Sequence, residues 1–190
     1  MRQKEWKRRA AEKAADSDGW VLDAACGTGS MIGQLERVGF KGKLIAIDAS
    51  KKMVGKAWAR ARRTGLKAQA VLADVSRLPL KAEGLQGVLC VFSVTTISRP
   101  EESVCEFRRT LSPGGRLVVL DSQKPHGLPA KLIYPFLVPI SRIFCHTYID
   151  RDIDGILEGQ PDLTRESKAA FMGGMVGLHD YRKLPVNRRM

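Results

Sequence analysis

Short apolar runs alternate with amphipathic segments along this chain as far as residue 121. The runs are almost continuously apolar, which is typical of strands covered on both faces of a parallel sheet. The segments between them repeat apolar positions every three to four residues, as helices do. Predicted strands cover residues 20–24, 43–48, 68–73, 86–92 and 116–121, and predicted helices cover 3–16, 30–38, 100–111 and a stretch beginning near Ser50. This alternation predicts a doubly wound α/β fold with a mostly parallel sheet and helices on both faces.

A loop of small residues follows the first predicted strand. Asp23, Ala25, Gly27 and Gly29 have the spacing D-x-A-x-G-x-G. Glycine lets backbone N–H groups approach a ligand closely, and the helix that follows adds a partial positive charge favouring a carboxylate or phosphate. Asp48 lies about 20 residues further on, where nucleoside-binding α/β folds place a carboxylate on the ribose hydroxyls. The spacing is not the G-x-G-x-x-G of dinucleotide folds, which argues against a nicotinamide dehydrogenase.

Two more motifs complete the series. Asp74-Val75 ends the third predicted strand, and Leu111-Ser112-Pro113-Gly114-Gly115 precedes the fifth. In order and spacing, the four motifs resemble those of the Rossmann-like methyltransferases that use S-adenosylmethionine. The run from Phe107 to Asp121, followed by Lys124-Pro125, is similar to the ubiquinone/menaquinone C-methyltransferase group of that family.

The resemblance implies S-adenosylmethionine as cofactor and assigns to each motif the part of the cofactor that it would bind. The glycine loop would surround the methionine part, Asp48 would bind the ribose, and the acid after the third strand would accept the adenine amino group. Phe92 would line the reacting end of the pocket. The expected cofactor-binding residues are Asp23, Ala25, Cys26, Gly27, Gly29, Asp48, Ala49, Asp74, Val75 and Phe92.

The end of the fourth predicted strand bears on catalysis. Residues 91–98 contain no carboxylate, no Asn-Pro-Pro and no Tyr, which argues against a DNA-adenine methyltransferase. Methyl transfer needs an aligned nucleophile, and a general base only where that nucleophile must lose a proton. Ser93 in this segment and His126 after the fifth strand are the catalytic candidates. No metal site is expected, because the four cysteines include no C-x-x-C pair.

The alternation breaks down after Asp121. Apolar residues from Leu132 to Phe144 fall on one helical face, which Pro135 and Pro139 would kink. A core-packing helix, a lid over an apolar substrate and a membrane-contacting segment all fit this pattern. Residues 163–182 predict a weak helix, so residues 126–190 are expected to form a mainly helical substrate or oligomer region. The family usually ends in an antiparallel hairpin, but no convincing pair of strands follows residue 150. A short sheet, a sheet completed by another subunit and a helical tail all remain open.

We therefore expect one domain, with a basic N-terminal helix in residues 1–18 and a cofactor-binding core in residues 19–125. Without a hairpin the fifth strand would lie at an open sheet edge, and an open edge favours pairing with a second subunit, as in a homodimer. A chain of 190 residues is long enough for one sizeable core.

Charge is the unusual bulk property. The formal net charge is +12, and residues 51–67 hold seven Lys and Arg without one acid. Solvated helix faces, attraction to an anionic membrane and nucleic-acid binding all remain open, although sparse aromatics argue against a base-stacking platform. The charged N-terminus and the lack of a long apolar run predict a cytoplasmic protein, peripheral to a membrane if it contacts one.

The expected function is methyl transfer from S-adenosylmethionine to a small-molecule or lipid-like acceptor. Two alternatives remain: an RNA methyltransferase, and a catalytically inactive cofactor-binding partner of another methyltransferase.

Overall fold

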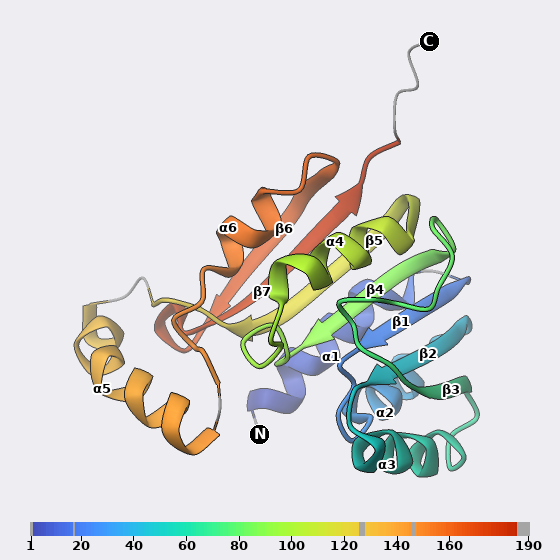
Figure 1. Cartoon of the computed structure of the whole chain (residues 1–190), viewed down its shortest axis with the longest axis horizontal. Coiled ribbons are helices and arrows are strands. Elements are labelled where there is room, and N and C mark those ends of the chain that lie inside the picture. The colour runs from blue at the N-terminus through green and yellow to red at the C-terminus, as the bar shows by residue number, and fades with distance from the viewer. Residues whose placement is uncertain (1, 17, 126–127, 146, 186–190) are drawn as a thin grey trace.

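A single seven-stranded sheet with the order β3-β2-β1-β4-β5-β7-β6 forms the centre of the molecule (Figure 1). The computed structural model describes residues 2–16, 18–125, 128–145 and 147–185. The strands are β1 (Trp20–Ala24), β2 (Lys43–Asp48), β3 (Lys67–Leu72), β4 (Leu85–Val91), β5 (Leu111–Ser122), β6 (Leu163–Phe171) and β7 (Val176–Lys183).

The first five strands are parallel, as the apolar runs predict. β1 lies between β2 and β4, with Asp23 opposite Ala46 on one side and Leu89 on the other. The carboxyl ends of these strands therefore meet at one edge of the sheet, where ligands of doubly wound folds bind. β5 begins earlier than the sequence predicts, because Leu111 already pairs with Leu85 before an irregularity in the register.

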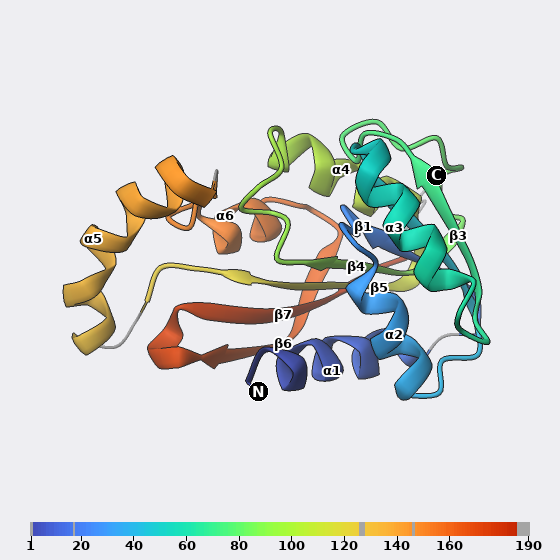
Figure 2. The same ribbon diagram turned by 90° about the horizontal axis from the view of Figure 1, so that it is seen from below.

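Helices cover both faces of the sheet (Figure 2). Side chains of α1, α2 and α3 belong to the core on one face, and side chains of α4 and α6 belong to the core on the other. The helices are α1 (Arg2–Ala15), α2 (Ser30–Arg37), α3 (Lys51–Ala61), α4 (Pro100–Thr110), α5 (Leu128–Cys145) and α6 (Ile153–Glu158), with a 3-10 turn η1 (Met172–Gly174).

Local signals set the ends of the helices that flank the site. Gly29, in the left-handed conformation with φ 74°, precedes α2, and Gly39 with φ 75° follows it. The Ser50 hydroxyl accepts a hydrogen bond from the Met53 N–H at 3.4 Å and so caps α3. The predicted helix boundaries in this half of the chain are confirmed within a few residues.

The prediction for the C-terminal region is wrong. Residues 163–182 form not a weak helix but the antiparallel hairpin of β6 and β7, with β7 inserted between β5 and β6. Gly173 and Gly174, with φ 64° and 88°, form its turn. The strand signal is hidden because β7 is buried yet carries His179, Asp180 and Lys183. The charged groups of Asp180 and Lys183 find their partners, Lys13 and the Leu111 carbonyl, only in the folded chain. Since β5 pairs with β7, the open edge that favoured a second subunit does not exist, and a homodimer stays a prediction without that support.

Helix α5 stands apart from the layers. Figures 1 and 2 both show it beyond the end of the sheet, and its main packing partner is η1. Its apolar residues do not enter either core, so the core-packing interpretation is wrong for the described side chains of this helix.

Candidate functional site

A pocket of about 320 Å³ lies at the carboxyl edge of the parallel strands. It draws on the loops after β1, β2, β3 and β4. Its lining residues are Ala25, Asp48, Ala49, Asp74, Val75, Thr96, Ile97, Ser98 and Arg99. Five of these were expected from the sequence to bind the cofactor, and the fold brings them together from segments about 25 residues apart, as doubly wound topology requires.

The glycine loop is held open by its backbone conformation and by Asp48. Ala25, Gly27 and Gly29 all have positive φ, at 50°, 53° and 74°. Asp48 accepts hydrogen bonds from the Gly27 N–H at 2.8 Å and the Ser50 N–H at 2.9 Å. The carboxylate therefore ties the loop after β1 to the start of α3 and keeps lone pairs for ligand hydroxyls. Ala25 tolerates the left-handed region at a cost of about 1–2 kcal/mol.

Asp23 is buried beneath this loop with only 2% of its surface exposed. Its Oδ2 atom has no hydrogen-bond partner among the described residues. Burial raises the pKa of Asp23 to about 7, opposed by the Lys7 ammonium and assisted by Asp48. A buried carboxylate without a donor is costly, so its position is best explained by a cationic or N–H-bearing ligand group.

Lys7 of α1 is the neighbour that the sequence did not indicate. Its Nζ atom donates to Ser30 Oγ at 3.0 Å and lies 5.7 Å from the ring centroid of Phe92. Burial lowers the pKa of Lys7, while the charge of Asp23 raises it. Lys7 is one of several basic residues of the predicted N-terminal helix, and the sequence does not distinguish it from the others. Only the packing of α1 on α2 brings its side chain to the glycine loop. Its nearness to the loop has no signature in local sequence.

The other end of the pocket is more open. The Asp74 carboxylate accepts from the Ser76 N–H and hydroxyl, both at 2.8 Å, and pairs with Arg99 at 2.7 Å. The hydrogen bonds from Ser76, and secondarily Arg99, lower the pKa of Asp74. Buried Val75 and exposed Ala49 also line the pocket, so a flat aromatic ring would find apolar side chains as well as a carboxylate there.

The loop after β4 closes the pocket on the side of β5. Phe92 begins it with φ 54°, and the Ser93 hydroxyl donates to the carbonyls of Ala25 at 3.0 Å and Val91 at 3.1 Å. The Ser93 hydroxyl hydrogen is therefore engaged with the backbone, and Ser93 stays a prediction as a catalytic residue. His126, the other candidate, lies outside the described residues.

The buried carboxylate of Asp121 holds the loop after β4 in place by hydrogen bonds. It accepts from Thr95 Oγ1 at 2.7 Å and from the backbone N–H groups of Thr95 and Ser122. Burial raises the pKa of Asp121, and these donors oppose the rise. Arg151, which follows α5 in the chain, donates hydrogen bonds to the carbonyls of Val94 and Ile97 and so also fixes the loop after β4.

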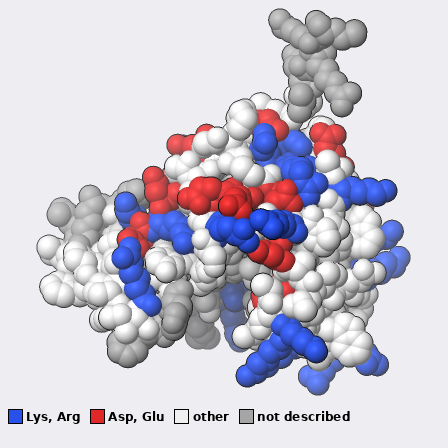
Figure 3. All heavy atoms as spheres, viewed as in Figure 1, with Lys and Arg blue, Asp and Glu red and all other residues white. Residues whose placement is uncertain are grey.

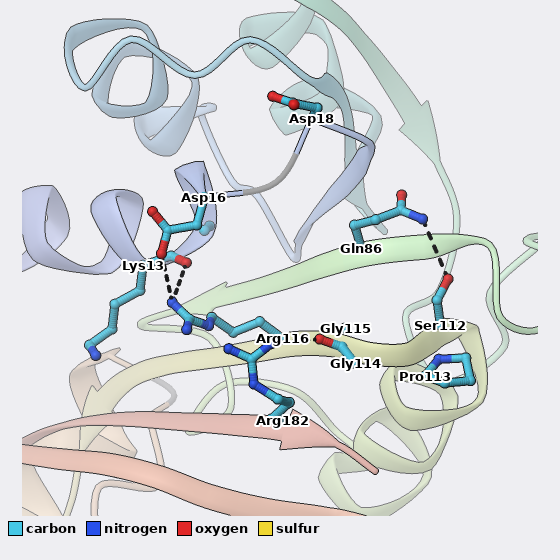
Figure 4. A pocket seen from close by; sticks show the side chains of 11 residues that line it. Lys13, Asp16, Asp18, Gln86, Ser112, Pro113, Gly114, Gly115, Arg116 and Arg182 are labelled. Carbon is cyan, nitrogen blue, oxygen red and sulfur yellow. Dashed lines mark hydrogen bonds and ion pairs between the residues drawn. The ribbon is translucent and has the colours of Figure 1, made fainter. Parts of the chain in front are cut away.

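A larger pocket of about 430 Å³ lies at the opposite, amino edge of the sheet (Figure 4). Arg116 there pairs with Asp16 at 3.2 Å and donates to the Lys13 carbonyl at 2.9 Å, and Gln86 contacts Ser112. These groups are engaged with one another. None of the residues expected to bind the cofactor lines it, so we assign the site to the carboxyl edge.

The residues at the carboxyl edge fit S-adenosylmethionine, the cofactor that the sequence resemblance implies. Its amino-acid end is a zwitterion, and the site offers the half-buried ammonium of Lys7 and the carboxylate of Asp23, whose Oδ2 atom has no hydrogen-bond partner in the described part of the chain. Asp48 suits a ribose diol, and Asp74 with Val75 suits the adenine ring. Cys26, whose N–H donates to the Ile47 carbonyl at 2.8 Å, holds the loop against β2.

Comparison with known proteins agrees with this geometry. A model of the methyltransferase domain family matches residues 22–119, more than half of the chain. The demethylmenaquinone methyltransferase of Thermus thermophilus is 30% identical over 130 residues, 68% of this chain and 59% of the relative. The ubiquinone/menaquinone biosynthesis C-methyltransferase UbiE of Pseudomonas entomophila is 32% identical over 124 residues, 63% of this chain and 48% of the relative. The chain thus spans about half to three fifths of the length of these relatives.

Solved structures share the fold. A putative methyltransferase from Bacillus halodurans superposes with a TM-score of 0.77 at 19% identity and covers 94% of this chain and 99% of its own. The [4+2]-cyclase SpnF superposes with a TM-score of 0.76 at 16% identity, and the superposition covers 95% of this chain and 80% of the cyclase. Since one of these is named a cyclase, the fold alone does not define the reaction. The match of the family model over the strands and loops that build the pocket shows that this chain belongs to the methyltransferase domain family.

Proposed function

We propose that this protein transfers a methyl group from S-adenosylmethionine to a small lipophilic acceptor. The observation that carries the cofactor assignment is the presence of both Asp23 and Lys7 at the glycine loop, each within electrostatic reach of the other. Asp23 is a buried carboxylate whose Oδ2 atom lacks a hydrogen-bond partner among the described residues, and Lys7 carries a half-buried ammonium. Together they complement the opposite charges of a free α-amino acid, which a nicotinamide dinucleotide does not have.

The site residues would act by binding and orientation. The sulfonium of the bound cofactor supplies the methyl group. Asp23 and Lys7 would hold the amino-acid end, and Asp48 and Asp74 the nucleoside, so that the methyl group faces the loop after β4. Such fixed alignment can supply much of the rate of a displacement reaction.

The loop after β4 would form the acceptor side of the site. Half-buried Ile97 lines the pocket, Phe92 is half-buried at the start of the loop, and residues 91–98 include no carboxylate. Asp121 and Arg151 fix the backbone of the loop. Apolar side chains at the reacting end of a site exclude water from the reacting atoms and suit a hydrophobic acceptor. The names of the two curated relatives point to prenylated quinones, which belong to this chemical class.

The two alternatives are less well supported. The inactive-partner interpretation rests on a missing terminal hairpin and on the lack of an acid after the fourth strand. β6 and β7 form that hairpin, which removes the first support, whereas residues 91–98 do lack an acid. An RNA acceptor relies on the basic segment at residues 51–67, which forms α3 and the chain after it, and none of these residues lines the pocket.

Calorimetric titration with S-adenosylhomocysteine tests the cofactor, with NAD as the control. We expect micromolar binding of the first and none of the second. Incubation with isotopically methyl-labelled S-adenosylmethionine then tests the acceptor, with a reduced prenylated naphthoquinone and a bulk RNA preparation supplied separately. Label in the quinol fraction supports the proposal, whereas label in RNA alone replaces it with the RNA methyltransferase.

A further inference from the structure

Helix α5 presents its large apolar side chains outward. An α-helix turns by about 100° per residue, so positions 132, 133, 136, 140 and 143 fall within an arc of about 100°. The stripe consists of exposed Leu132, Ile133, Phe136, Ile140 and Ile143. Leu132 and Phe136 each keep 73% of their surface exposed and Ile143 keeps 67%. A contiguous exposed stripe of this kind marks an interaction surface.

The side of α5 that faces the protein holds both hydroxyl side chains of the helix, together with half-buried apolar ones. Tyr134 donates its hydroxyl to the Ile149 carbonyl at 2.6 Å, and Ser141 donates to the Thr147 carbonyl at 3.1 Å. Tyr134 and Ser141 lie roughly opposite the stripe on the helix. These two contacts tie that side of the helix to residues that follow it in the chain, so the stripe points away from the fold.

The chain segment that contains the stripe carries basic residues only. Residues 122–149 contain Lys124, Lys131 and Arg142 and no acidic residue. Arg142 pairs with Asp150, so much of the attraction for an anionic surface comes from the net charge of +12 of the whole chain. Figure 3 shows a mainly uncharged outer surface at the end of the molecule where Figure 1 places α5.

We propose that the outward stripe of α5 docks this protein on an anionic lipid bilayer, with the helix lying in the plane of the interface. Apolar side chains on one face of a projecting helix, combined with an excess of positive charge, are the two attractions that hold an interfacial helix. No helix among the described residues is long and apolar enough to cross a membrane, so α5 lies on the bilayer. This inference does not depend on the proposed methyl transfer.

The backbone of α5 also favours an interface over a dry protein contact. Pro135 and Pro139 have no N–H, so carbonyls one turn earlier lose their helical partner. Water and lipid head groups can satisfy such carbonyls, whereas a close-packed protein surface would leave them unpaired. A symmetric contact between two copies of α5 would also bring basic residues together, because the helix has no carboxylate of its own.

Flotation with lipid vesicles tests the inference and needs neither cofactor nor acceptor. The full chain is mixed with vesicles of phosphatidylcholine and phosphatidylglycerol, and separately with vesicles of phosphatidylcholine alone. We expect the protein to float with the anionic vesicles and much less with the neutral ones, and high salt should weaken this binding. The double variant Phe136→Ser/Ile143→Ser should bind the anionic vesicles about a hundredfold more weakly, because two large apolar side chains no longer enter the interface.

The matched control is Trp58→Ser, which removes a half-exposed aromatic side chain from the basic helix α3. It should float like the wild type, and thermal melting followed by circular dichroism should show both variants folded. The inference is overturned if the wild type does not float, or if the double variant floats as well as the wild type. Loss of binding in Trp58→Ser alone would assign the docking surface to α3. A wild-type dimer in light scattering that the double variant loses would assign the stripe to a second copy of the chain.

Discussion

Replacing Asp23 by Asn should make the folded protein more stable at pH 8 while weakening its affinity for S-adenosylhomocysteine. The side chain is buried, and its Oδ2 atom has no hydrogen-bond partner within the residues that the structure describes. Burial raises its pKa in the folded protein to about 7 from the usual 3.8. The amide has nearly the same shape but carries no charge to desolvate. The same substitution removes the carboxylate that we assign to the ligand ammonium.

The size of the stability effect follows from the pKa difference. Because the pKa in the folded state lies above that in the unfolded state, Asp23 stabilises the fold when protonated, and this contribution is lost as the pH rises through 7. Each pH unit between the two values corresponds to about 1.4 kcal/mol, so the wild type should lose about 3 kcal/mol between pH 5 and pH 8 from this group alone. Asp23→Asn should not show this loss.

Urea denaturation of both proteins at pH 5 and pH 8 measures the effect, because contributions from all other titrating groups cancel in the difference. Asp18→Asn, an exposed position with the same change of charge, serves as the control and should follow the wild type at both pH values. Parallel curves for wild type and Asp23→Asn would refute the reasoning, since they would mean that the Asp23 carboxylate is not desolvated without a partner. Unchanged ligand affinity would separately refute its assigned role.

The remaining predictions concern the ligand and the backbone. In calorimetric titrations, Lys7→Met should weaken the binding of S-adenosylhomocysteine about 10- to 100-fold. It should leave the binding of methylthioadenosine unchanged, because this ligand has no amino-acid end. The control Lys4→Met, at an exposed position, should change the binding of neither ligand. Asp48→Ala should abolish binding of both ligands and, because it also unpairs the Gly27 N–H, lower the free energy of unfolding by about 1–3 kcal/mol; retained binding would contradict the ribose assignment. Gly177→Ala should destabilise strongly in thermal melts, since its Cβ would lie 2.1 Å from Gln123 Oε1 and 2.4 Å from His179 Nε2, and both of these side chains are buried and have little room to move. Gly55→Ala, within α3 and with nothing nearby, should raise stability by up to about 1 kcal/mol, and equal effects of the two alanines would contradict the packing at β7.

Much of the nucleotide half of the fold can be read from the chain itself. The run into Asp23, the small-residue loop and the apolar strand ending in Asp48 are local patterns, and their geometry depends mainly on glycine conformation, capping and strand burial. Once the strands are parallel and in this order, their carboxyl ends must meet, so Asp48 and Asp74 converge on one pocket without any further information.

Other features depend on contacts between distant segments, which local sequence does not encode. β7 is a central strand although it holds His179, Asp180 and Lys183, because Lys183 donates to the Leu111 carbonyl at 2.8 Å and Asp180 pairs with Lys13 of α1 at 2.8 Å. Lys7 reaches the glycine loop only because α1 packs against α2. The periodicity of α5 predicted an apolar face, but hydrogen bonds from Tyr134 and Ser141 turned that face outward. Sequence therefore determined where strands, helices and the nucleoside-binding loops form, and the tertiary structure decided how buried charges are paired and which apolar face is left exposed, because both depend on partners far away in the chain.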